Sequence, residues 1–128
     1  MRCLIVDDSA DFVDAARGLL ESEGCSVVGA ASTSAEALRH FEELRPDVTL
    51  VDINLGAESG FELAEQLSRI WGRQAAPIIL ISTHAAEDFA DMIETSPAVG
   101  FLSKSALTCA AIRELAGRSV SFEEGDHR

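Results

Sequence analysis

Short apolar runs alternate along the chain with longer amphipathic segments. Cys3–Val6, Val48–Val51 and Ile78–Ile81 are wholly or almost wholly apolar, and Ser26–Ala30 and Val99–Leu102 are apolar over a similar length. Continuous apolar runs of this length are typical of strands that are covered on both faces, as in a parallel sheet. The pattern therefore predicts five buried strands.

The intervals between these runs repeat apolar residues at helical spacing. The first predicted helix begins near Asp8 or Ser9 and is closed by Gly24. The others are predicted over Ser34 to Pro46, Gly60–Trp71, Glu87–Glu94 and Ala106–Ala116. Alternating strands and helices with right-handed crossovers predict a doubly wound α/β sheet with helices on both faces. Ligands of such sheets bind beyond the carboxyl ends of the strands.

Length and composition indicate one globular domain. The chain has 128 residues, of which 47% are hydrophobic and 25% charged. It contains no apolar run near the roughly 20 residues of a membrane span, and its start leaves no room for a signal peptide. We therefore expect a cytoplasmic protein without a membrane partner. The formal net charge of −12 argues against direct nucleic acid binding, because phosphate contacts need Lys and Arg.

The chain has three cysteines, Cys3, Cys25 and Cys109. They are widely separated, odd in number and without CxxC spacing, so neither a disulfide framework nor a zinc site is expected. We expect three free, buried thiols in a reducing compartment.

Polar residues end four of the five predicted strands. The first ends at Asp7-Asp8, the third at Asp52, the fourth at Ser82-Thr83 and the fifth at Lys104. Carboxylates brought a few ångströms apart repel one another, and a divalent cation removes that repulsion. Mg²⁺ fits best, with Mn²⁺ as the substitute, because it prefers oxygen ligands and is commonly held by one or two carboxylates plus a phosphate.

With a metal in place, one carboxylate can act as a nucleophile toward phosphorus and form an aspartyl phosphate. Asp52 is the expected nucleophile because it stands alone, whereas Asp7 and Asp8 form a pair suited to holding the metal. Lys104 and Ser82 can then bind phosphoryl oxygens.

The sequence resembles the response-regulator receiver family over essentially residues 1–116. The resemblance lies in five pieces in order: LIVDDS at Leu4–Ser9, DVTLVDINL at Asp47–Leu55, SGFEL at Ser59–Leu63, PIILIST at Pro77–Thr83 and GFLSK at Gly100–Lys104. It implies a flavodoxin-like fold with sheet order 2-1-3-4-5, a receiver over residues 1–117 and a polar tail over residues 118–128.

The resemblance also implies a role for each site residue. Asp52 is the implied phosphoacceptor, and Asp7, Asp8, Asp52 and the backbone carbonyl of Asn54 are the implied metal ligands. Lys104 is the residue that contacts the phosphoryl group. Ser82 and Phe101 are the implied switch residues. Thr83 is implied to line the wall of the site. Ser82 is preferred to Thr83 as the switch hydroxyl because it lies 22 residues before Lys104.

Some positions depart from the family pattern or stay open. Gly56 and Ser105 stand where many members have proline, and Phe101 replaces the commoner tyrosine. Phe101 fits the role of an ordinary core aromatic residue about as well as that of a switch residue. His84 is a candidate for tuning hydrolysis of the phosphoaspartate or an ordinary loop histidine.

The resemblance implies a stand-alone response regulator. Its branch usually carries a C-terminal helix-turn-helix, and only about a dozen residues follow the last predicted helix here. The expected phosphodonor is a sensor histidine kinase. The expected output is a downstream protein target or a homodimer through the face formed by the fourth helix, fifth strand and fifth helix. Apart from self-phosphorylation and autodephosphorylation at Asp52, no enzyme activity is expected.

Three rival functions were weighed against this interpretation. A Mg²⁺-dependent phosphohydrolase tends to carry a second acid two residues after its nucleophile, where this chain has Asn54. A relative that has lost phosphorylation would not need the full set of Asp7, Asp8, Asp52 and Lys104. A flavin-binding relative would follow its first strand with a hydroxyl- and glycine-rich loop.

Overall fold

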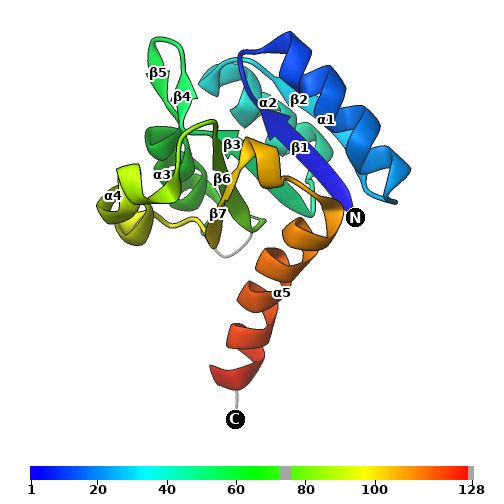
Figure 1. Cartoon of the computed structure of the whole chain (residues 1–128). Helices are drawn as coiled ribbons and strands as arrows, with labels where there is room; N and C mark the ends of the chain where they lie inside the picture. The colour runs from blue at the N-terminus through cyan, green and yellow to red at the C-terminus, as the bar shows by residue number, and fades with distance from the viewer. Residues whose placement is uncertain (73–75, 127–128) are drawn as a thin grey trace.

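The protein is a five-stranded parallel sheet between two layers of helices (Figure 1). The computed structural model describes residues 1–72 and 76–126, and the side chains of Ala86 and of residues 118–126 lie outside that description. The strands are ordered β2-β1-β3-β6-β7, so the predicted order 2-1-3-4-5 is confirmed. Their bounds are β1 Arg2–Val6, β2 Ser26–Ala31, β3 Val48–Asp52, β6 Ile78–Ser82 and β7 Gly100–Ser103.

The helices lie close to their predicted positions. Helix α2 begins at Ser34, behind the cap Thr33, whose hydroxyl accepts a hydrogen bond from the Glu36 N–H. Helix α3 begins at Gly60, behind the cap Ser59. The bounds are α1 Ala10–Ser22, α2 Ser34–Leu44, α3 Gly60–Trp71, α4 Ala90–Thr95 and α5 Cys109–Asp126, with 3₁₀ turns η2 Ala86–Phe89 and η3 Lys104–Ala106.

The core has two halves because alternate residues of each strand point to opposite faces. Cys3 and Ile5 of β1 belong to the half that packs against α1 and the start of α5. Leu4 and Val6 belong to the half that packs against α2 and α3. Helix α4 buries no residue completely.

Two segments differ from the prediction. The stretch after Asp52, expected to be a loop, contains the small antiparallel hairpin β4 Asn54–Leu55 and β5 Glu58–Ser59. Helix α5 runs from Cys109 to Asp126, whereas the last helix was expected over Ala106–Ala116, so both expected ends were wrong. Gly117 does not stop it, because a glycine inside a helix costs only about 1 kcal/mol relative to alanine. The rest of the predicted tail, residues 127–128, lies outside the described residues.

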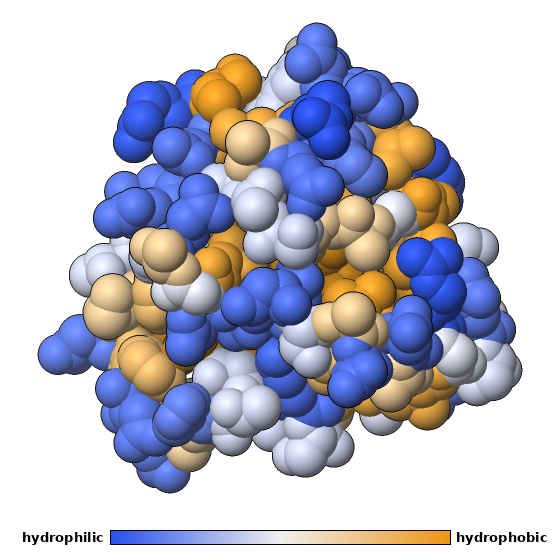
Figure 2. All heavy atoms as spheres, turned by 90° about the horizontal axis from the view of Figure 1, so that it is seen from above, coloured by the Kyte–Doolittle hydropathy of each residue, from blue (hydrophilic) through white to orange (hydrophobic). Residues whose placement is uncertain are grey.

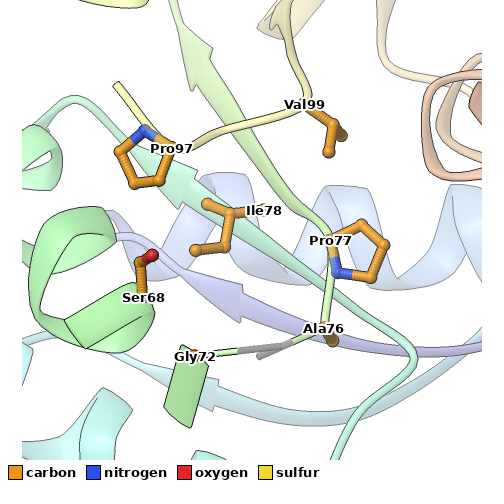
Figure 3. A pocket seen from close by; sticks show the side chains of 7 residues that line it. All are labelled: Ser68, Gly72, Ala76, Pro77, Ile78, Pro97 and Val99. Atoms are coloured by element: carbon orange, nitrogen blue, oxygen red, sulfur yellow. The ribbon is translucent and has the colours of Figure 1, made fainter. Parts of the chain in front are cut away.

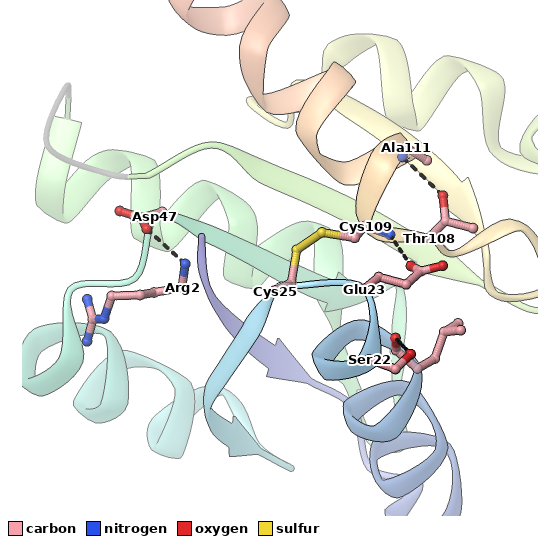
Figure 4. The surroundings of a disulfide bond; sticks show 9 residues. Arg2, Ser22, Glu23, Cys25, Asp47, Thr108, Cys109 and Ala111 are labelled. Atoms are coloured by element: carbon pink, nitrogen blue, oxygen red, sulfur yellow. Dashed lines mark hydrogen bonds between the residues drawn. A yellow bond between two sulfur atoms is a disulfide. The ribbon is translucent and has the colours of Figure 1, made fainter.

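The cysteine prediction was wrong for two of the three residues. Cys25 and Cys109 form a disulfide across 84 positions of sequence (Figure 4). It joins the turn before β2 to the first residue of α5, where the Cys109 N–H also donates to Glu23 Oε1 at 2.8 Å. Cys3 is a free, buried thiol, as expected. Pairing depends on which loops meet in space, and widely spaced cysteines do not reveal it.

Candidate functional site

The polar strand ends meet at one edge of the sheet, as predicted. Asp7 follows β1, Asp52 ends β3, Ser82 ends β6 and Lys104 follows β7. These strands are neighbours and parallel, so their carboxyl ends share an edge. Figure 2 looks down on this end of the molecule, where hydrophilic residues dominate and hydrophobic ones are scattered among them.

Lys104 lies between two buried carboxylates. Its Nζ is 2.6 Å from Asp7 Oδ2 and 3.0 Å from Asp52 Oδ2. The ammonium also lies 4.4 Å from the centre of the Phe12 ring, within the range of a cation–π interaction. Helical spacing of apolar residues does not predict this contact.

The second oxygen of each buried carboxylate accepts a backbone hydrogen bond. The Ser9 N–H donates to Asp7 Oδ1 at 2.8 Å, and the Asn54 N–H donates to Asp52 Oδ1 at 3.1 Å. These bonds fix the orientation of both carboxylates. Asp8, in contrast, is exposed.

Asp7, Asp8 and Asp52 form a cluster in which one oxygen from each lies within 4.8 Å of the others. Three carboxylates and one ammonium sum to a charge of −2, which a divalent cation would neutralise. Among the described residues, Asp7 Oδ2 also has no well-directed hydrogen bond, although the Lys104 ammonium is close. A donor set made only of oxygens suits a hard cation such as Mg²⁺. The cluster is therefore an acidic triad of a kind that can hold a divalent metal ion.

The two central groups have shifted pKa values. Burial raises the pKa of Asp52 above its ordinary value of 3.8, and the charge of Asp7 adds to the rise; the Asn54 N–H and Lys104 oppose it. Burial by itself lowers the pKa of Lys104, but its contacts with Asp7 and Asp52 outweigh that effect and the pKa is raised. The lysine is therefore held in its charged form, whereas burial makes the charged form of Asp52 less favourable in free energy.

The other predicted site residues lie around this centre. Ser82 is buried, and its Oγ accepts a hydrogen bond from the His84 N–H at 3.0 Å. Thr83 and Asn54 are exposed, and Phe101 is partly buried against the half of the core next to α2 and α3. Within the described part of the chain, none of these four side chains forms a hydrogen bond or ion pair with Asp52 or Lys104.

The hairpin adds a contact that the sequence did not predict. Gly56 has a φ of 71°, and a Cβ at this position would lie 3.3 Å from Asp8 Oδ2. Glu58 Oε1 accepts a hydrogen bond from the Ser34 N–H at 2.9 Å, which ties the hairpin to the start of α2. In the sequence, Gly56 stands out only because many family members have proline there.

A hollow of about 350 Å³ opens beside the acidic pair, and Asp14, Arg17 and Glu36 are among the residues that line it. A smaller hollow of about 100 Å³ is lined by residues before and after β6, among them Pro77 and Pro97 (Figure 3). Among the residues that the structure describes, those that line the smaller hollow are all uncharged.

The sequence model of one protein family, the response regulator receiver domain, matches residues 3–115 of this chain. The chain belongs to this family. A putative transcriptional regulator of Pseudomonas aeruginosa is 32% identical to the receiver over 120 residues, which cover 91% of the chain. The chain spans 57% of the length of that relative.

Solved receivers share the fold. The receiver domain of a modulated diguanylate cyclase from Desulfovibrio desulfuricans is 33% identical, with a TM-score of 0.78. The match covers 95% of this chain and 97% of that one. A LuxR-family response regulator from Aurantimonas is 30% identical, with a TM-score of 0.74, and the match covers 81% of this chain and 74% of that one. None of the helices in the described residues is long and apolar enough to cross a membrane.

Proposed function

We propose that Asp52 accepts a phosphoryl group from the phosphohistidine of a sensor histidine kinase in a Mg²⁺-dependent reaction. The observation that carries this proposal is the Lys104 ammonium, held 3.0 Å from Asp52 Oδ2, with the carboxylates of Asp7 and Asp8 clustered beside Asp52. A lysine that served only solubility would not be placed between two buried acids, because burying charges is costly.

The chemistry follows from these residues. One Asp52 carboxylate oxygen forms the new bond to phosphorus, and the bond from phosphorus to the histidine nitrogen breaks. The nitrogen keeps the bonding electrons and takes a proton from water. Lys104, already charged, binds an oxygen of the arriving group.

Asp7, Asp8, Asp52 and the Asn54 carbonyl are the residues that would hold the cation. When bound, Mg²⁺ neutralises charge on the phosphoryl oxygens. The three carboxylates would repel a phosphoryl group without such compensation.

The same proposal assigns a switch to the neighbouring residues. The Ser82 hydroxyl, which now accepts from the His84 N–H, would turn to the phosphoryl group, with Thr83 at the wall of the site. Phe101 would then change its packing on β7. The surface that reports the change is η2, α4, β7 and the start of α5, and its partner is a protein target or a second copy of the chain.

The proposal places this receiver in the cytoplasm with a histidine kinase, and without direct nucleic acid binding or a membrane. Receiver domains interact with histidine kinases, and they are generally non-catalytic apart from their own dephosphorylation.

Intact mass after incubation with acetyl phosphate and Mg²⁺ tests the proposal. Wild type should gain one phosphoryl group, Asp52→Asn should gain none, and the exposed control Asp91→Asn should behave as wild type. No gain by wild type, or an equal gain by Asp52→Asn, would refute the proposal. Sustained release of phosphate from phosphate monoesters would indicate a hydrolase instead.

A further inference from the structure

Gly60, the first residue of α3, lies directly against the backbone of the proposed phosphoacceptor. A Cβ at this position would lie 2.0 Å from the carbonyl oxygen of Asp52 and 2.8 Å from its carbonyl carbon. It would also lie 2.8 Å from the Cα of Ile53. All three contacts are with backbone atoms, so no side chain can rotate away to make room.

Both sides of this contact are held in place. On the strand side, Asp52 pairs with Ile81 of β6, and the Ile53 N–H donates to the Ile81 carbonyl at 3.0 Å. On the helix side, the Gly60 N–H donates to the Ile53 carbonyl at 3.0 Å. Buried residues along α3 anchor the helix to the core: Phe61, Leu63, Ala64 and Leu67.

Helix propensity alone would favour alanine over glycine at position 60. Alanine in a helix is more favourable than glycine by about 1 kcal/mol. The missing side chain therefore serves the approach of α3 to the Asp52–Ile53 peptide. A side chain here would push apart the helix and the end of β3, and so move the Asp52 carboxylate relative to Lys104 and Asn54.

We propose that Gly60 is a positioning residue for phosphorylation. Because Gly60 has no side chain, α3 can pack against the Asp52 backbone and hold the Asp52 carboxylate at its position relative to Lys104 and the other metal ligands. The inference rests on the proposed function of Asp52. Gly60 lies against the backbone of Asp52, not its carboxylate, and acts through that backbone.

The test compares Gly60→Ala with two controls. Gly18→Ala places a methyl group on α1 where, apart from its chain neighbours and the backbone of the helix itself, no heavy atom lies within 4 Å. Ser59→Ala removes the side-chain cap of α3, which accepts from the Phe61 N–H at 3.2 Å, and so weakens the same helix without adding bulk. For each protein, three quantities are measured: the urea midpoint of unfolding, the dissociation constant for Mg²⁺ by calorimetry, and the phosphorylation rate against acetyl phosphate concentration.

Gly60→Ala should weaken Mg²⁺ binding and lower the maximal phosphorylation rate, each by about 10- to 100-fold, the usual effect of losing a residue that orients a metal ligand. Its half-saturating acetyl phosphate concentration should change little. Gly18→Ala should match wild type in both site measurements. Ser59→Ala should lower the urea midpoint, because losing a side-chain cap destabilises the helix, and should leave both site measurements close to those of wild type.

Wild-type values for Gly60→Ala would overturn the inference, as would equal site losses in Gly60→Ala and Ser59→Ala. If Gly60→Ala is unfolded in buffer, the measurements are repeated in trimethylamine N-oxide, which favours the folded state. A variant that still does not fold would show that Gly60 serves folding alone, and would also overturn the inference. If wild type itself gains no phosphoryl group, the proposed function fails, and the Mg²⁺ measurement still decides whether Gly60 positions the acidic site.

Discussion

Asp52 carries its charge where little water reaches it, since only 5% of the residue is exposed. Asn54 and Lys104 donate to its two oxygens, yet its pKa is raised, first by burial and then by Asp7. A carboxyl group that binds its proton more tightly when the chain is folded favours folding at low pH. That contribution is lost as the pH rises through the raised pKa.

Asp52→Asn is therefore expected to be more stable than wild type at pH 7 without metal, by on the order of 1 kcal/mol. The difference should shrink as the pH falls through the raised pKa of Asp52 toward its ordinary value of 3.8, because the wild-type carboxyl group then becomes neutral. Urea unfolding of both proteins in EDTA at several pH values measures the difference, with the exposed Asp91→Asn as control. A less stable Asp52→Asn at pH 7 would show that Lys104 more than offsets the cost of burial.

The elements that depend on local pattern were the ones predicted well. The strands were found because both faces of the sheet are covered, which makes runs such as Val48–Val51 apolar throughout. Helices α2 and α3 were found because their caps and apolar spacing agree. The site followed from the same logic, since Asp7, Asp52, Ser82 and Lys104 end or follow neighbouring parallel strands.

The features that were missed depend on contacts between distant segments. The two strands of the hairpin, Asn54–Leu55 and Glu58–Ser59, are too short and too polar for the sequence pattern to indicate them. The hairpin also depends on a distant contact, the hydrogen bond between Glu58 and the start of α2. The contact of Gly60 with Asp52 is invisible in sequence for the same reason. Helix α5 passes through Gly117 because nothing there ends it.

The disulfide is the long-range contact with the largest expected effect on α5. Closing an 84-residue separation is worth about 4.5 kcal/mol in the chain-entropy estimate. Reduction, or Cys25→Ser with Cys109→Ser, should lower the free energy of unfolding by up to that amount. Calorimetry with and without reductant measures the loss.

Counting thiols by alkylation and intact mass provides the control. Cys3 should stay unmodified in the folded protein, because burial raises its pKa to about 11 and the thiolate is the reactive form. One cysteine should react after denaturation and all three after reduction. Three reactive thiols in the unreduced, denatured protein would contradict the disulfide.

For the whole molecule, the formal net charge of −12 has two separable effects. Self-repulsion destabilises the compact state, and any salt screens it. The acidic triad adds a specific effect, because a ligand that binds only the folded state stabilises it by mass action.

Mg²⁺ should therefore raise the unfolding temperature more than NaCl of equal ionic strength. At ten times the dissociation constant the specific part is about 1.4 kcal/mol, which corresponds to roughly 5 °C for a domain of this size. Asp8→Asn should abolish this excess while keeping the response to NaCl, because Asp8 is the exposed member of the triad and its loss leaves the fold intact. Asp14→Asn, an acid on α1 outside the triad, should keep both responses. Equal effects of the two salts on wild type would mean that Mg²⁺ acts only as a screening ion and that the triad does not hold it.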